Sequence, residues 1–104
     1  MKQFDVYLIN FDPTIGAEIK KTRPGVIVSP DDMNKNLQTI IVAPLTHKTK
    51  NYPSRVFTLF KNQNGQVILD QLRSVDKQRL IKKQGVIDAA TASDIKLVLQ
   101  TMFC

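Results

Sequence analysis

FDPTIGAEIKKTRPGVIVS, residues 11–29, is the stretch that decides how this chain folds. One apolar, strand-like segment ends at Pro13 and a second opens at Pro24. Since proline biases the residue before it toward extended backbone, Arg23 should be extended at the edge of the loop between them. Gly16 suits the positive φ of a tight reversal. The stretch therefore predicts a basic loop between two strands, with one arginine at its edge, which suits a phosphate-bearing ligand.

Length and composition predict a single domain spanning residues 1–104, large enough to bury a core. The net charge of +6 favours nucleic acid, an acidic protein or an anionic surface as partner. Cys104 is the single cysteine, so an intramolecular disulfide is excluded. The N-terminus lacks the features of a signal peptide, and no run of about 18 apolar residues is present. We therefore expect a cytoplasmic protein without a membrane segment.

Short β-rich runs separated by turn signals predict strands at residues 4–11, 25–29, 38–45, 55–60, 67–69 and 72–75. Both faces of the first run are apolar, which predicts a strand covered on both sides. Asn64-Gly65 predicts a hairpin turn.

Helices are predicted in three places. Asp31 or Asp32 should cap a short helix that ends at Asn36. Residues 75–80 should form a helical turn, followed by exposed lysines at 82 and 83. Residues 91–94 resemble a capping box, so one long C-terminal helix should begin there. The fold class is therefore mainly β with α, a small antiparallel β barrel with a short helix and a C-terminal helix.

The chemistry-bearing residues exclude several kinds of site. One histidine and one terminal cysteine cannot form a structural zinc site, and the nucleotide-binding and serine-hydrolase motifs are absent. The acidic residues are scattered, so no metal site is expected. Arg23 is either a surface arginine, paired with Glu18, or a fork for phosphate oxygens. Thr46 ends a strand, and the basic loop after it is either a solvated face or a nucleic-acid track.

Three blocks of the sequence resemble the MazF/PemK family of toxin–antitoxin toxins. Residues 11–29 resemble the family's first signature, of form DPTxGxExxxxRPxxVxS. VAPLT at residues 42–46 resembles its third strand with a terminal threonine, and VILDQLRSVDKQRL at residues 67–80 resembles its third signature. The match runs in register over nearly the whole chain. Some members carry histidine and arginine where this chain has Ala17 and Ile68.

This resemblance implies an SH3-like barrel, usually a homodimer, that cleaves single-stranded RNA (mRNA) sequence-specifically, without metal or cofactor. The products would be a 2′,3′-cyclic phosphate and a 5′-hydroxyl. Arg23 and Thr46 match the catalytic arginine and threonine. RNA binding would involve two loops and the turn after residue 69, with candidate residues Thr14, Gly16, Glu18, Lys20, Lys21, His47, Lys48, Asp70 and Gln71. A cognate antitoxin with an acidic, disordered segment is the implied protein partner.

Two other functions remain open on the sequence alone. A gyrase poison on the same barrel would not need Arg23 or Thr46, and a non-catalytic SH3-like binding module would need only the basic charge. The general base of the nuclease is also open, with Glu18, Asp70 and the RNA itself as candidates.

Overall fold

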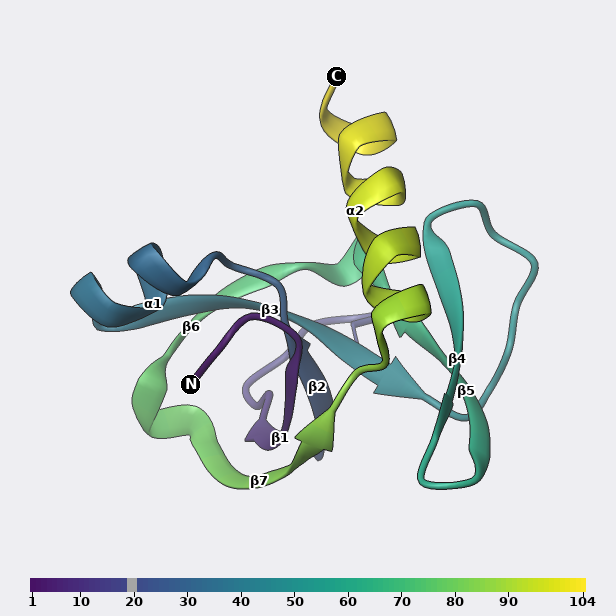
Figure 1. Cartoon of the computed structure of the whole chain (residues 1–104). Helices are drawn as coiled ribbons and strands as arrows, with labels where there is room; N and C mark the ends of the chain where they lie inside the picture. Colours follow the sequence, from purple (N-terminus) through teal and green to yellow (C-terminus); the bar gives the residue numbers. More distant parts are fainter. Residues whose placement is uncertain (19–20) are drawn as a thin grey trace.

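The computed structural model describes residues 1–18 and 21–104. These form a curled antiparallel sheet with two helices (Figure 1). In chain order the elements are β1 (Asp5–Asn10), β2 (Thr22–Ile27), α1 (Asp31–Asn36), β3 (Thr39–Thr46), β4 (Arg55–Phe60), β5 (Gln63–Ile68), the 3-10 turn η1 (Leu69–Gln71), β6 (Arg73–Asp76), the 3-10 turn η2 (Lys77–Arg79), β7 (Leu80–Val86) and α2 (Ala89–Phe103). The predicted fold class is confirmed.

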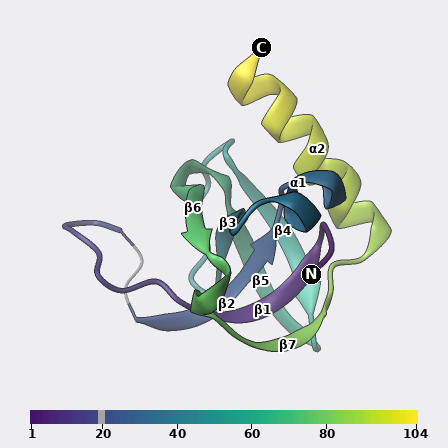
Figure 2. The same ribbon diagram turned by 90° about the vertical axis from the view of Figure 1, so that its left-hand side faces the viewer.

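β3 is the strand that joins the two halves of the sheet. The order of the strands is β4-β5-β3-β2-β1-β7, and β6 also pairs with β3. One edge of β3 pairs with β2, and its other edge pairs with β6 near its start and with β5 at Leu45 and Thr46. In Figure 2 residues 11–18, which follow β1, reach outward from the sheet, while α2 lies on the opposite side. The end of β3 thus meets both halves of the molecule.

The core has two parts, and β1 contributes to both. Val6 packs with Phe4 in the cluster that includes Ile95 of α2. Ile9 and Phe11 pack in a second cluster on the opposite face of the strand. Val6 and Ile9 of β1, and Phe11 just after it, are each at most 1% exposed. The predicted first strand with two apolar faces is therefore confirmed, and its covering lies within the chain.

The predicted strand at residues 25–29 is placed too late. β2 begins at Thr22, so Pro24 lies inside it, opposite Leu8 of β1. The ladder between β2 and β3 nevertheless ends at Gly25, next to the proline that has no N–H to donate. Gly25 has no room for a side chain, because a Cβ there would be 2.6 Å from Cδ1 of Ile9.

One strand was not predicted from the sequence. Residues 80–86 form β7, which pairs with β1 at the edge of the sheet. Its lysines at 82 and 83 are exposed, as expected, but they are part of a strand. Lysine is common on edge strands because its charge discourages pairing with other chains. Lys83 also forms an ion pair of 3.4 Å with the buried carboxylate of Asp5.

The predicted hairpin turn at Asn64-Gly65 is wrong. Both residues lie in β5, and the turn is at Lys61-Asn62, whose φ angles are 50° and 62°. A two-residue hairpin loop of this type needs two positive φ angles, which asparagine tolerates well. Gly65 serves packing instead, since a Cβ there would lie 2.8 Å from the carbonyl oxygen of Thr46.

The helices are confirmed, but their predicted caps are wrong. α1 begins at Asp31 after Pro30 and has no side-chain cap; the Asp31 carboxylate accepts the N–H of Gln3 at 2.8 Å instead. α2 begins at Ala89, before the predicted start at 91, because Asp88 caps it by accepting the N–H of Thr91. The helical turn at residues 77–79 is confirmed. No helix of the described residues is long and apolar enough to cross a bilayer.

Candidate active site

Arg23 and Thr46 lie at neighbouring strand ends. β2 and β3 are antiparallel, and the last pair of their ladder is Gly25 opposite Pro44. Arg23 lies two residues before Gly25 in β2 and Thr46 lies two residues after Pro44 in β3, so strand alternation gives each the same face as its neighbour in this pair. Directly opposed residues of an antiparallel pair project their side chains to the same face of the sheet. The two residues therefore belong to one face and one edge of the sheet. Arg23 is exposed and also pairs with Ile9 of β1.

Thr46 is held on three sides at the end of β3. Its side chain is buried, with 5% exposure, and its residue pairs with Gln66 of β5. Its hydroxyl oxygen accepts the N–H of Lys48 at 3.2 Å, so the loop turns back onto it. A hydroxyl that accepts in this way still has its own hydrogen to donate. Gly65 allows the neighbouring strand to approach the Thr46 carbonyl closely.

Two hollows lie beside this edge, and Gln71 lines both. The first, of about 180 Å³, is lined by Phe11, Glu18, Pro44, Asp70, Gln71, Leu72 and Arg73. The second, also about 180 Å³, is lined by Ala17, Thr46, Lys48, Lys50, Arg55, Ile68 and Gln71. Because they share Gln71, we call the two together the Gln71 groove. Four cationic and two acidic side chains line it, so it favours an anion.

The loop after β1 is anchored at its base. The Asp12 carboxylate accepts the N–H of Lys21 at 2.8 Å, and the N–H of Phe11 donates to the Lys21 carbonyl at 3.0 Å. Arg73 donates to the carbonyl of Phe11 at 2.7 Å, and Arg79 donates to the carbonyl of Asp12. These bonds close the two ends of the loop against the sheet. Gly16 has a φ of 61°, so the predicted positive φ is confirmed.

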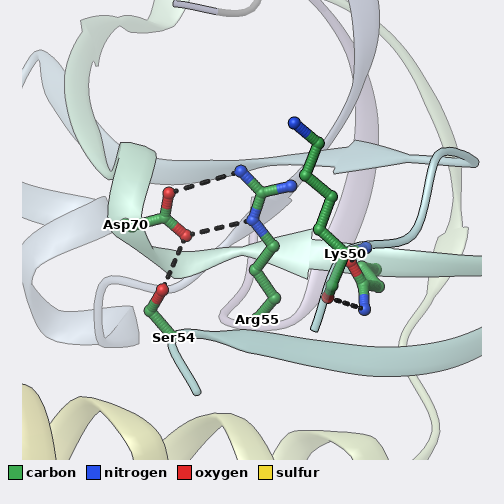
Figure 3. Close-up of polar contacts among 5 residues, drawn as sticks. Lys50, Ser54, Arg55 and Asp70 are labelled. Atoms are coloured by element: carbon green, nitrogen blue, oxygen red, sulfur yellow. Dashed lines mark hydrogen bonds and ion pairs between the residues drawn. The ribbon is translucent and has the colours of Figure 1, made fainter. Parts of the chain in front are cut away.

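An ion pair joins Arg55, which lines the second hollow, to Asp70, which lines the first. Figure 3 shows this pair. Arg55 donates from Nε and Nη2 to the two carboxylate oxygens of Asp70, at 3.4 and 3.5 Å. The Ser54 hydroxyl donates to the same carboxylate at 2.9 Å. Burial opposes ionisation of Asp70, but the hydrogen bonds from Ser54 and Arg55 outweigh it, so the pKa of Asp70 lies below its usual value. The guanidinium also stacks on Tyr52, 4.9 Å from the ring centroid.

The loop after β3 is tied to β5 by one side chain. The Gln66 amide accepts the N–H of Lys50 and donates to its carbonyl, both at 2.9 Å. Nearby, Nδ1 of His47 lies 3.3 Å from the carbonyl oxygen of Asn64. These contacts fix the backbone that carries Lys48 and Lys50 into the second hollow.

The structure brings some of the predicted site residues together. Thr46, Glu18, Lys48, Asp70 and Gln71 all line the Gln71 groove. Other described candidates are not among its lining residues: Thr14, Gly16, Lys21, Arg23 and His47. Lys20 lies outside the described residues, so its predicted place in the loop is not tested.

Sequence reasoning included Lys50 and Arg55 only in a basic set that is either a solvated face or a nucleic-acid track, and it missed the lining residues Pro44 and Arg73. The pattern offered no signal for Arg55 beyond the basic loop before it, because only strand pairing brings β4 next to the turn that carries Asp70. Among residues 1–18 and 21–104, no three histidine, cysteine or acidic side chains gather as metal ligands.

Residues 2–103 match the profile of a family described as the PemK-like, MazF-like toxin of type II toxin–antitoxin systems. The chain belongs to this family. The resemblance of the three sequence blocks is thereby confirmed.

Curated MazF relatives match across nearly the whole chain. An endoribonuclease MazF of Staphylococcus epidermidis is 34% identical over 95% of this chain and 92% of its own length. Another, of Staphylococcus saprophyticus, is 32% identical over 98% of this chain and 95% of its own length. The crystal structure of MazF from Deinococcus radiodurans superposes with a TM-score of 0.86, at 24% identity, over 98% of this chain and 94% of that one. The expectations of an endoribonuclease toxin and of its fold are confirmed.

Proposed function

We propose that this MazF-family chain acts as a single domain that cleaves single-stranded mRNA sequence-specifically. Arg23 and Thr46 carry the reaction, and the Gln71 groove holds the strand beside them. The relatives are named endoribonucleases, which favours the nuclease over a gyrase poison or a non-catalytic binding module. An mRNA substrate places the activity in the cytoplasm.

One observation carries the assignment of the catalytic pair. The register of β2 and β3 ends at Gly25 opposite Pro44, and the positions of Arg23 and Thr46, two residues beyond this pair, support one shared face at the same end of the two strands. Residues far apart in the sequence are thereby available to one phosphate. The orientation of the Thr46 hydroxyl by the N–H of Lys48 supports a role as hydrogen-bond donor to that phosphate.

The proposed reaction is an internal transfer within the RNA. The ribose 2′-oxygen forms a bond to the adjacent phosphorus, and the bond from phosphorus to the 5′-oxygen breaks. The proton of the 2′-hydroxyl passes to a base, and the departing 5′-oxygen takes up a proton, so the products are a 2′,3′-cyclic phosphate and a 5′-hydroxyl. Negative charge grows on the phosphoryl oxygens, where Arg23 and Thr46 donate hydrogen bonds.

Asp70 is the weakest of the candidate bases. Its pKa lies below the usual value because Ser54 and Arg55 donate to it. A general base works best with a pKa near the operating pH, so this carboxylate is poorly matched to the task. Glu18 lines the first hollow and accepts the N–H of Ile15 at 2.7 Å, so it and the RNA itself remain as the candidates.

The test is cleavage of a long mixed-sequence RNA in EDTA, with the 5′ ends mapped. We expect discrete cuts at one short motif. Arg23→Ala and Thr46→Ala should each lower the rate by at least about 10²-fold, the effect of removing one preorganised donor. Thr39→Ala, at the other end of β3, is the matched control for Thr46, and Lys35→Ala is the control for Arg23.

The outcomes separate the roles. Full cleavage by a folded Arg23→Ala or Thr46→Ala variant would remove that residue from the mechanism. Absence of cuts by the folded wild-type chain on any RNA would reject the nuclease. Discrete cuts abolished by EDTA would reject the metal-independent reaction.

An antitoxin with an acidic, disordered segment is the proposed protein partner. A solved mycobacterial endoribonuclease of the same fold is bound to its cognate antitoxin. In this chain the net charge of +6 and the cationic lining of the Gln71 groove would attract such a segment. Bound there, the segment would exclude RNA. The partner's effect is measured by adding a synthetic acidic peptide to the cleavage assay at two salt concentrations.

A homodimer is proposed through α2. The two apolar faces of β1 are covered within the chain, so β1 is not proposed as part of the interface. α2 instead exposes Leu97 at 60% and Phe103 at 71%. Exposed apolar side chains gathered on one element favour a protein interface.

A further inference from the structure

Arg55 differs from the other cations of the second hollow in its burial. Its side chain is 10% exposed, whereas Lys48 and Lys50 are exposed. It begins β4 and lies opposite Ile68 of β5. Burying a guanidinium in a hollow is costly unless its donors meet acceptors. We therefore expect the Arg55 guanidinium to bind specific acceptors and not merely to increase solubility.

The contacts of Arg55 hold its guanidinium in one plane. Asp70 faces two of its nitrogens, at 3.4 and 3.5 Å, and Tyr52 packs on its face at 4.9 Å. The carboxylate is itself held by the Ser54 hydroxyl. These donor–acceptor distances are longer than the usual range of roughly 2.7–3.2 Å, so the carboxylate orients the arginine without satisfying it fully.

Donors remain on the guanidinium after this pairing. It carries five N–H groups, and the carboxylate faces two nitrogens. Figure 3 shows the third nitrogen pointing away from Asp70, on the side where the Lys50 ammonium lies. Lys50 and Arg55 line the same hollow, together with Thr46. A fixed planar fork beside two flexible ammonium groups is suited to phosphate oxygens.

We propose that Arg55 binds a backbone phosphate of the RNA in the second hollow, and that Asp70 is the residue that positions its guanidinium. This inference rests on the proposed ribonuclease function. Thr46 lines the second hollow beside Arg55, whereas Arg23 does not. The phosphate assigned to Arg55 is therefore the neighbour of the one that Thr46 and Arg23 share. The carboxylate stays ionised at neutral pH and so keeps the fork in place.

The test measures binding of an RNA with a 2′-deoxy nucleotide at the mapped cut site, over a series of salt concentrations. Arg55→Ala should weaken binding about tenfold and reduce the slope of log K against log salt by about 0.7, the value for one phosphate contact on a single strand. The loss should be equal for RNAs that differ in sequence around the cut, because phosphate contacts carry no base information.

Matched variants make the result decisive. Lys61→Ala, in the turn at the other end of β4, should leave the salt slope unchanged. Arg55→Gln keeps most of the bulk of the side chain and should reproduce the loss of slope, so it serves if the alanine variant does not fold. Asp70→Ala should weaken binding in the wild-type background and have no further effect in the Arg55→Ala background, as coupled residues do.

Three results would overturn the inference. An unchanged salt slope in folded Arg55→Gln, with the wild-type chain binding normally, rejects the phosphate contact. Additive effects of Asp70→Ala and Arg55→Ala reject the positioning role, since a purely structural carboxylate would act on folding without this coupling. Failure of the folded wild-type chain to bind or cleave any RNA rejects the ribonuclease function, and with it this inference.

Discussion

Gly65 of β5 packs directly against the backbone carbonyl of Thr46, so closely that a Cβ at position 65 would lie 2.8 Å from its oxygen. This contact joins the second half of the sheet to the end of β3. It leaves no space for any side chain larger than hydrogen at position 65. The place of the Thr46 hydroxyl thus depends on a glycine of another strand.

Gly65→Ala is expected to harm both stability and cleavage. The neighbour is backbone and cannot rotate away, so overpacking should cost about 1–3 kcal/mol of the free energy of unfolding. A shift of Thr46 should lower the cleavage rate about 10²-fold. Urea unfolding and RNA cleavage measure the two effects. Ser74→Ala, on the exposed face of β6, is the control, and wild-type stability and cleavage in Gly65→Ala would contradict the close contact.

Asp70→Asn should change how stability depends on pH. The pKa of Asp70 in the folded chain lies below its ordinary value of 3.8, so near that pH the unfolded chain binds more protons than the folded one. The carboxylate therefore stabilises the fold above about pH 4, and this contribution is lost as the pH falls through the lowered pKa. Urea unfolding from pH 2 to 7 should show wild type and variant converging at low pH. A constant difference would reject the ion pair as its source.

Asp88→Ala should weaken α2 at its start. The carboxylate accepts the N–H of Thr91 at 3.2 Å and its hydroxyl at 2.6 Å. Loss of a capping side chain costs about 1 kcal/mol of stability. Asp94→Ala is the informative comparison, because the sequence pattern placed the capping carboxylate there. If Asp94→Ala proves the more destabilising of the two, the cap at Asp88 is wrong.

Leu97→Glu should disrupt the proposed homodimer. The leucine is 60% exposed on α2, so the change needs no repacking within the chain. A charge at an apolar interface is strongly unfavourable when it is left unpaired. Light scattering coupled to size exclusion should show a dimer for wild type and a monomer for the variant. Lys96→Glu, the neighbouring exposed position, controls for added charge, and a monomeric wild type would rule the dimer out.

The sequence predicted which segments form strands better than it predicted where each strand begins and ends. Alternation placed β4 well, since it buries residues at a period of two, and the two apolar faces of β1 predicted a strand covered on both sides. It failed for β7, where successive lysines at the sheet edge hide the period. The prediction of a turn at Asn64-Gly65 was wrong, because the glycine is needed for close packing against the carbonyl of Thr46 and does not lie in a turn. The residues next to Gly65 in the sequence do not show that a close contact with another strand requires glycine at this position.

The sequence predicted only part of the candidate site. The missing part depends, like Gly65, on contacts between strands that are distant in sequence. Motif positions gave Arg23 and Thr46 as candidates, and both lie just past the end of the β2–β3 ladder. Arg55 carried no distinguishing pattern, because its partner Asp70 is brought near only by the pairing of β4 with β5. Residues defined by their own loop can be predicted from sequence. Residues whose role depends on a partner from another strand can be recognised only once the fold is known.

β3 pairs along both edges, whereas the segment after β1 is joined to the sheet through residues such as Phe11 and Asp12, and the segment after β3 through the side chains of Gln66 and His47. The hydroxyl of Thr46 is consequently as rigid as the sheet itself, while the surrounding segments can accept substitutions and changes of length. Substitutions in these loops can therefore change which RNA sequence such an enzyme recognises, while the sheet that carries Thr46 stays the same.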